Sequence, residues 1–188
     1  ALDNVTGMAR VTENGSSGLH GIRFTGDLLP GTTYTKSIFV RGSARPAITL
    51  YMRETDLRIA SFHVDLATGQ VVAGHTSLPA TCNVKACPSN TYRVDLTFTT
   101  SDTPAVDAYI DLRMSNVWPV SSPDGASYVG DGASGVYVWG FQWEVGPRAS
   151  SYIPTNGAPV VRAADMLDVF IREIWFERQL GTLLIDYD

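Results

Sequence analysis

The chain has 188 residues, with 14 basic and 19 acidic side chains and a formal net charge of −5. This length is one domain's worth and is long enough to bury a core without disulfides or metal ions. The negative charge argues against nucleic acid or an anionic membrane as the main partner, because both require a basic face. No apolar run approaches the ~20 residues of a membrane-spanning helix, so no membrane insertion is expected. Because the first residue is Ala1, we expect a fragment or a processed product.

Short segments of alternating or β-branched residues recur along the chain, separated by turn residues. The segments typical of strands are 19–25, 33–42, 46–54, 58–66, 91–100, 105–114 and 134–146. Turn signals such as DLATGQ and SSPDGAS lie between them. The connections are too short for crossover helices, which favours antiparallel pairing. The pattern therefore predicts an all-β antiparallel sandwich.

An aromatic row stands out in VYVWGFQWEVG, where period two places four large rings on one side. They are Tyr137, Trp139, Phe141 and Trp143. The row is either part of the core or a platform on which sugar rings stack. We favour the core, because such a row exposed on a monomer would promote aggregation. Gln142 and Glu144 then lie on the opposite face and become candidate polar ligand contacts.

Two further aromatic residues lie in SNVWPVSSPDGASYVGDG, a loop by composition. A tryptophan in a loop is costly to expose, which makes Trp118 a candidate for ligand or interface contact. Tyr128 shares this interpretation. Arg53, near the end of the expected strand 46–54, is a further polar candidate.

Cysteines and carboxylates leave several alternatives open. Cys82 and Cys87 either form a local disulfide that closes a surface loop or remain free thiols; zinc is disfavoured because the three histidines are scattered. Glu54 and Asp56 have the spacing of a carboxylate pair for glycoside hydrolysis, but a solvated surface is the better interpretation. Three turn aspartates are candidate calcium ligands or ordinary turn residues: Asp124, Asp131 and Asp165.

The tail differs from the rest of the chain. Residues 165–181 carry apolar side chains at helical spacing, although a segment so rich in Trp and Phe is equally compatible with an extended strand. Residues 181–188 resemble one more strand. We therefore expect one domain over 1–166. Residues 167–188 are expected to be a linker, an oligomerisation element or the first strand of a following domain.

The segment SYVGDGASGVYVWGFQWEVGPRASSYIPTNGAPVVRAADML (127–167) resembles a signature in bacteriophage tail and tail-fibre proteins and in some bacterial surface proteins. Upstream, PGTTYTKSIFVRG (30–42), HVDLATGQV (63–71) and NTYRVDLTFT (90–99) are similar to other strands of that family. The chain departs from the family pattern at Phe141 and Trp143, where small Ala and Leu are usual. The cysteine loop is also outside the pattern.

This resemblance implies a jelly-roll, carbohydrate-binding-module-like domain of a virion, hence extracellular, protein, often with structural calcium. The leading hypothesis is a non-catalytic adhesin that recognises host surface polysaccharide, with avidity supplied by a homotrimeric fibre. Trp118 and Tyr128 are the expected stacking residues, and Arg53, Gln142 and Glu144 the polar contacts. The alternatives are a structural virion domain that binds other virion proteins, and an accessory domain of a polysaccharide-degrading tail enzyme.

Overall fold

The computed structural model describes residues 7–155 and 160. By its internal contacts the chain divides into Ala1–Pro154, which holds the strands described below, and Thr155–Asp188. The strands are β1 (Ala9–Thr12), β2 (Ser17–Gly18), β3 (His20–Thr25), β4 (Thr33–Gly42), β5 (Ala47–Thr55), β6 (Arg58–Asp65), β7 (Val71–Thr76), β8 (Ala80–Cys87), β9 (Thr91–Thr99), β10 (Tyr109–Ser115), β11 (Tyr128–Val129) and β12 (Gly135–Val145).

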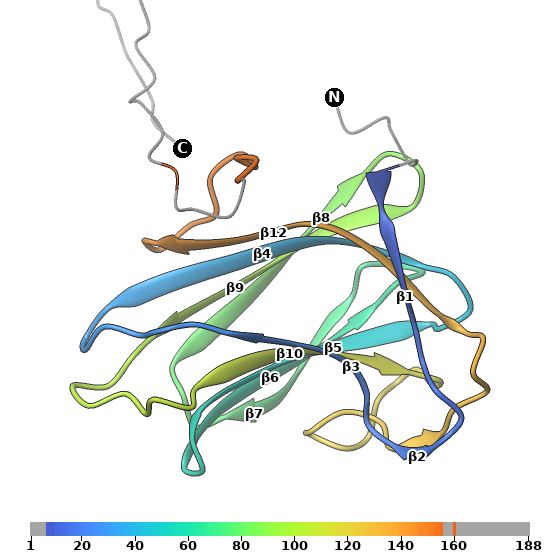
Figure 1. Ribbon diagram of the computed structural model, residues 1–188, viewed down its shortest axis with the longest axis horizontal. Coiled ribbons are helices and arrows are strands. Elements are labelled where there is room, and N and C mark those ends of the chain that lie inside the picture. Colours follow the sequence, from blue (N-terminus) through green and yellow to red (C-terminus); the bar gives the residue numbers. More distant parts are fainter. Residues whose placement is uncertain (1–6, 156–159, 161–188) are drawn as a thin grey trace, which may run out of the picture. The chain divides into compact units, whose positions relative to one another are not determined.

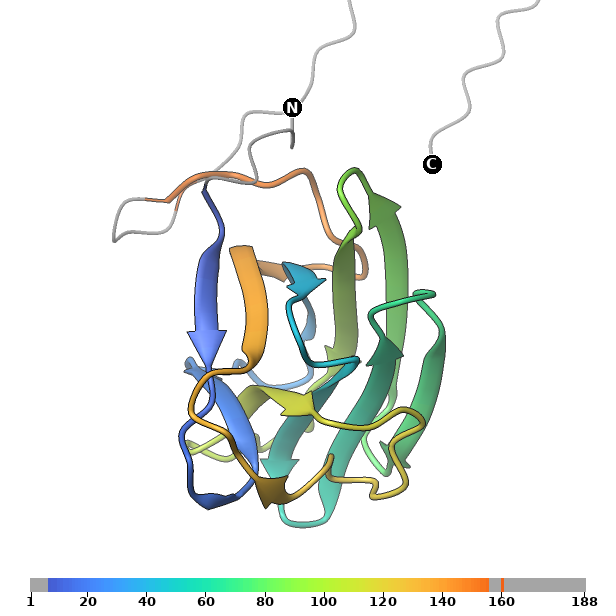
Figure 2. The same ribbon diagram turned by 90° about the vertical axis from the view of Figure 1, so that its right-hand side faces the viewer.

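Two antiparallel five-stranded sheets pack face to face (Figures 1 and 2). Sheet A has the order β1-β12-β4-β9-β8, sheet C the order β3-β10-β5-β6-β7, and β2 pairs with β11 in a short ribbon. The chain alternates between the large sheets, from β4 in A to β5–β7 in C, back to β8 and β9 in A, then to β10 in C and β12 in A. This is a jelly-roll sandwich. The predicted all-β fold is confirmed for the described residues.

The core lies between the sheets and follows the period-two alternation of each strand. On β9 the inward side chains Val94, Leu96 and Phe98 are buried, while Arg93 and Asp95 face outward. The central strands of sheet C contribute buried residues in the same way: Ile48, Leu50, Met52, Ile110, Leu112 and Met114. The segments predicted from alternation all contain strands of these sheets.

The sequence pattern does not predict β1, β7 and β8. All three are end strands of their sheets, and most of their side chains are exposed or half-buried. An end strand packs against fewer neighbours, so it needs fewer large apolar residues and its alternation is weak.

Strand β8 contains both cysteines and holds them apart. Cys82 and Cys87 are the third and last residues of β8, and both are free thiols. Five residues of extended strand separate them by about 17 Å, far beyond the ~6 Å between Cα atoms that a disulfide spans. Of the two alternatives that the sequence leaves open, the structure therefore has the free thiols and not the local disulfide. Burial raises the pKa of the Cys82 thiol to about 12.

A β-bulge divides the predicted aromatic row into two pairs. The register of β12 against β4 shifts between Trp139 and Gln142, and Gly140 there adopts a φ of +62°, which favours glycine. Phe141 and Trp143, beyond the bulge, pack against the core, as the sequence predicted. Tyr137 and Trp139, before the bulge, lie on the outer face of sheet A, so the prediction that all four rings share the core face is wrong for these two. On the outer face Arg41 lies 4.6 Å from the centre of the Tyr137 ring, and the Tyr152 ring lies 4.5 Å from the Trp139 ring.

Glu54 does not lie on the solvated surface, where the sequence analysis places it together with Asp56. Its side chain is fully buried and accepts hydrogen bonds from Arg58 Nε at 2.7 Å and from the Ser101 backbone N–H at 2.8 Å. Asp56 is 86% exposed and pairs with Arg53. The solvated-surface prediction therefore holds for Asp56 alone, because Glu54 faces inward on β5 while Asp56 lies beyond the end of that strand.

Lys36 occupies an inward position of β4, where its neighbours in the pattern are apolar. The residue is 3% exposed, and its Nζ lies over the Trp143 ring without a hydrogen-bond partner among the described residues. Burial lowers the pKa of Lys36 to about 6. Between about pH 6 and pH 10.5, Lys36 is protonated in the unfolded chain but not in the folded chain. The penalty on folding is therefore largest at low pH and disappears as the pH rises toward 10.5.

We predict that Lys36→Met raises the free energy of unfolding at pH 7 by roughly 2–4 kcal/mol, because methionine fills the same space without a proton to release. The gain should shrink to less than about 1 kcal/mol at pH 10. Urea unfolding at both pH values measures this. The exposed Lys85, the other lysine of the chain, supplies the control Lys85→Met. An unchanged or lower stability of Lys36→Met at pH 7 would contradict the prediction.

Residues 167–188, the predicted linker or following strand, and the expected helix over 165–181 lie outside the described residues, as does the predicted boundary at residue 166. These remain predictions.

Candidate functional site

Outward-facing positions of three neighbouring strands place arginines and tyrosines together on the outer face of sheet C. On β10, Tyr109, Asp111 and Arg113 alternate with the core residues. The antiparallel register sets Asp111 opposite Arg23 of β3 on one side and opposite Tyr51 of β5 on the other. The same register sets Tyr109 opposite Arg53. We call these residues the arginine–tyrosine cluster: Arg23, Tyr51, Arg53, Tyr109, Asp111 and Arg113.

The Asp111 carboxylate joins two arginines of the cluster. Arg23 donates from Nε to Oδ1 at 2.7 Å and from Nη2 to Oδ2 at 3.0 Å. Arg113 donates to Oδ2 from Nε at 3.1 Å and from Nη2 at 2.8 Å. The side chains of Asp111 and Arg113 are 10% and 8% exposed, whereas that of Arg23 is 53% exposed. The hydrogen bonds to Asp111 raise the pKa of Arg23.

Each of these arginines also lies over a tyrosine ring. The Arg23 guanidinium carbon is 3.5 Å from the centre of the Tyr109 ring, and that of Arg113 is 3.6 Å from the centre of the Tyr51 ring. The two rings are 6.2 Å apart at a small interplanar angle. Tyr51 is buried, and this burial raises its pKa. Tyr109 is half-buried, so the exposed part of the cluster is the Arg23–Tyr109 stack.

Arg53 is the predicted ligand residue that the fold brings into this cluster. Its guanidinium carbon lies 5.6 Å from the centre of the Tyr109 ring. It pairs with Asp56 at 2.6 Å and with Asp107 at 3.2 Å, and both carboxylates are exposed. These two carboxylates outweigh the single charge of Arg53, so this group contributes no excess positive charge to the face.

The connection between β10 and β11 covers the neighbouring part of the same face. Arg113 Nη1 donates to the backbone oxygen of Asp124 at 2.6 Å, and the Asp124 carboxylate lies 2.9 Å from His75 Nε2. The Ser61 hydroxyl donates to the backbone oxygen of Pro123. Beneath this cover, polar side chains such as His63 are buried, and burial lowers the pKa of His63. The connection leaves Arg23 and Tyr109 uncovered.

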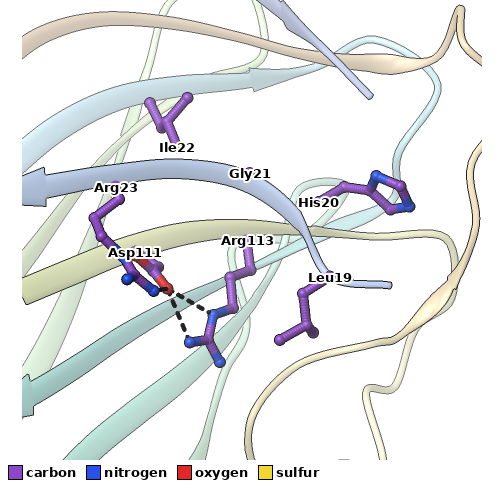
Figure 3. Close-up of a pocket in the computed structure, with 7 residues that line it drawn as sticks. All are labelled: Leu19, His20, Gly21, Ile22, Arg23, Asp111 and Arg113. Atoms are coloured by element: carbon purple, nitrogen blue, oxygen red, sulfur yellow. Dashed lines mark hydrogen bonds and ion pairs between the residues drawn. The ribbon is translucent and has the colours of Figure 1, made fainter. Parts of the chain in front are cut away.

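A hollow of about 220 Å³ lies beside the cluster, at the end strand of sheet C (Figure 3). Its lining comes from two strands and the residue before β3: Leu19, His20, Gly21, Ile22, Arg23, Asp111 and Arg113. Figure 3 shows Arg23, Asp111, Arg113 and Leu19 on one side of β3 and Ile22 on the other. At Gly21 an added Cβ would lie 2.0 Å from the Leu112 backbone oxygen, so close strand packing requires glycine there.

Tyr128 lies next to this hollow through His20. The two ring centres are 4.7 Å apart, and His20 Nε2 is 3.2 Å from the Tyr128 backbone oxygen. The Tyr128 hydroxyl donates to the buried Glu13 carboxylate at 2.7 Å. Arg45 also donates twice to Glu13, and the Asp131 backbone N–H donates to it at 2.8 Å. Tyr128 thus connects the first strands of the chain to the loop before β12.

Asp131 closes that loop. One of its carboxylate oxygens accepts the backbone N–H groups of Ala133 and Ser134, and the other accepts the Ser134 hydroxyl and Arg45. The glycine- and aspartate-rich text SYVGDGASG therefore has a folding role.

Gln142 and Glu144 lie on the outer face of sheet A and bind the segment after β12. Gln142 accepts the Ile153 backbone N–H at 2.7 Å, and Glu144 accepts the backbone N–H and the hydroxyl of Ser150. They are therefore on a different sheet from Arg53. Trp118, which lies in the connection after β10, is half-buried. The structure does not bring the five predicted ligand residues together at one site.

Asp124 and Asp131, the two predicted calcium ligands that the structure describes, have protein partners. Both carboxylate oxygens of Asp131 are occupied by N–H and O–H donors, and the Asp124 carboxylate pairs with His75. Within residues 7–155 and 160, no group of three His, Cys, Asp or Glu side chains has the arrangement of a metal site. Asp165 lies outside these residues, and calcium stays a prediction from the resemblance.

Comparisons with known proteins assign no family. A scan against protein-family models matches none, and a search of curated proteins finds no relative. In the part of the chain that the structure describes, no helix is long and apolar enough to span a bilayer.

Five members of the cluster, all except Arg53, are not among the ligand residues predicted from the sequence, although a signal for them exists. In IRF, LYMR and YIDLRM the polar or aromatic residues alternate with apolar ones, so their outward direction was readable from the sequence. That β3, β10 and β5 lie side by side was not readable, because residues distant in the sequence form these pairings.

We predict that Glu13→Gln lowers the free energy of unfolding by about 3 kcal/mol at pH 7, because it leaves the Arg45 charge without its buried partner. Hydrogen bonds from Arg45 hold the pKa of Glu13 at about 2 in the folded chain, below the ordinary 4.5. The wild type should therefore lose this stabilisation as the pH falls through that interval, and Glu13→Gln should lose less.

Urea unfolding between pH 7 and pH 2 measures both effects. Asp107→Asn, which removes one exposed partner of Arg53, is the matched control and should change stability by less than about 1 kcal/mol. Equal effects of the two substitutions would refute the structural role given to Glu13.

Proposed function

We propose that the domain is a non-catalytic carbohydrate-binding module of a phage tail or tail-fibre protein that recognises host surface polysaccharide. The observation that carries this proposal is the arginine–tyrosine cluster beside the hollow on the outer face of sheet C. The jelly-roll fold and the resemblance of residues 127–167 to phage tail proteins support it further.

The chemistry of the cluster suits a sugar. The C–H faces of a sugar ring pack on apolar and aromatic surface, and its hydroxyls and charged substituents require fixed hydrogen-bond partners. The Arg23–Tyr109 stack offers both, because the Tyr109 ring supports the guanidinium from below, the outer face of the guanidinium is flat, and Arg23 retains N–H donors. Asp111 holds Arg23 in place from a buried position. A shallow site of this kind binds a single glycan weakly, at about 0.1–1 mM.

The proposal is for binding without turnover. Glu54 and Asp56, the one carboxylate pair singled out from the sequence, do not share a site: the first is buried against Arg58 and the second is exposed. Hydrolysis would require two carboxyl groups about 5–10 Å apart across one sugar bond. An accessory role beside a separate catalytic domain is compatible with the same binding face, and turnover of host polysaccharide by this chain alone would overturn the non-catalytic proposal.

We predict that Tyr109→Ala weakens glycan binding at least tenfold, because it removes the ring beneath Arg23. The measurement is a titration of the chain with a panel of bacterial glycans, followed by the shifts of backbone amide signals in NMR spectra. Trp118→Ala belongs in the same series and should also weaken binding if that residue stacks on the glycan.

Tyr137→Ala is the matched control, since Tyr137 is a half-buried tyrosine with an arginine over its ring on the outer face of sheet A. It should leave glycan binding within twofold of the wild type. A loss in Tyr137→Ala with full binding in Tyr109→Ala would move the site to sheet A.

A structural virion domain that binds protein is the second candidate, and the outer face of sheet A favours it. Tyr137 and Trp139 lie there with Arg41, and Trp139 packs over the buried Phe39. Aromatic residues and arginine are typical of interface centres. If this candidate is correct, light scattering should show an oligomer that Tyr137→Ala weakens and Tyr109→Ala does not. A monomer at millimolar concentration would count against it.

A further inference from the structure

We propose that the hollow beside Arg23 and Arg113 binds the anionic group of an acidic polysaccharide, a sugar carboxylate or a bridging phosphate. This inference rests on the proposed function and specifies the class of glycan.

The charge of the lining is positive, although the whole chain carries −5. Arg23 and Arg113 bring two positive charges and Asp111 one negative charge, which leaves a net charge of +1. The next carboxylate, Asp124, is not part of the lining and lies 2.9 Å from His75 Nε2. On the same face Arg53 and its two carboxylates, Asp56 and Asp107, sum to −1, so the net positive charge is confined to the lining of the hollow.

The free polar groups of the two arginines are donors. A guanidinium has five N–H groups and no acceptor. Arg23 donates two hydrogen bonds to Asp111, from Nε and Nη2, and its side chain is 53% exposed. Arg113 donates three, to Asp111 and to the Asp124 backbone. The remaining N–H groups are available to acceptors, and a carboxylate or phosphate supplies several together.

Asp111 and Tyr109 fix the orientation of the Arg23 guanidinium. Asp111 accepts one edge of the guanidinium and the Tyr109 ring lies 3.5 Å below it. The outer edge is therefore pre-oriented, which lowers the entropy lost on binding. Gly21 presents no side chain at the hollow, and the volume of about 220 Å³ corresponds to roughly seven water molecules at ~30 Å³ each, enough for one acidic sugar unit.

The test titrates the folded chain with three polymers of different charge. They are oligogalacturonate, the same oligomer as its neutral methyl ester, and poly(glycerol phosphate). We expect one of the two anionic polymers to bind at least tenfold more tightly than the ester, with NMR shift changes at Gly21 and at the Arg23 and Arg113 side-chain N–H groups. Binding of the oligogalacturonate assigns the hollow to sugar carboxylates, and binding of the phosphate polymer assigns it to bridging phosphates.

Variants of Arg23 separate contact from general charge. Arg23→Ala should weaken binding of the anionic polymer at least tenfold. Arg23→Lys should restore only part of the lost affinity, because an ammonium group lacks the planar fork of a guanidinium. Arg148→Ala removes the same charge from an exposed position and should change binding less than twofold. Thermal unfolding confirms that each variant is folded.

The outcomes distinguish this inference from the proposed function. If neutral glycans bind through Tyr109 and neither anionic polymer binds, the inference is wrong and the carbohydrate-binding proposal stands. Equal losses in Arg23→Ala and Arg148→Ala would also overturn the inference. If no glycan of any charge binds, both are wrong.

Discussion

Two sheets that pack face to face require every central strand to place alternate side chains in the dry layer between them, and this constraint organises the molecule. On β10 it sends Leu112 and Met114 inward and leaves Asp111 and Arg113 outside. The candidate site is therefore made of the positions that the core does not use. Antiparallel pairing then selects which outward residues meet, since Asp111 faces Arg23 across one ladder and Tyr51 across the other.

The same constraint is relaxed at two places in sheet A. The bulge at Gly140 exchanges the faces of β12, so that Trp143 fills the core and Trp139 lies outside against Tyr152. Lys36 keeps its inward position but carries an amine, and the core accepts it with a lowered pKa and a ring beneath it. Both features arise where β4 and β12 pair, and the large ring of Trp143 packs against the Lys36 side chain there.

The most distinctive motif of the sequence, SYVGDGASG, does not form the candidate site, and the reason is physical. In SYVGDGASG the glycines allow a tight turn, Asp131 accepts its N–H groups, and Tyr128 reaches the buried Glu13. A motif of this kind is required for folding, whatever the ligand is. The cluster on sheet C has no motif, because its members are single residues on three strands. The two meet at His20, which contacts Tyr128 and lines the hollow.

The sequence by itself determined the fold class, most of the strands and the inward or outward direction of their side chains, because alternation is a local property of an extended chain. It could not reveal the bulge at Gly140, the strand that separates Cys82 from Cys87, or the burial of Glu54, since each depends on what lies across the sheet or beneath it. The tertiary structure alone decided which residues form the site. Arg23 and Asp111 are 88 residues apart in the chain, and only the pairing of β3 with β10 brings their charges within hydrogen-bonding distance.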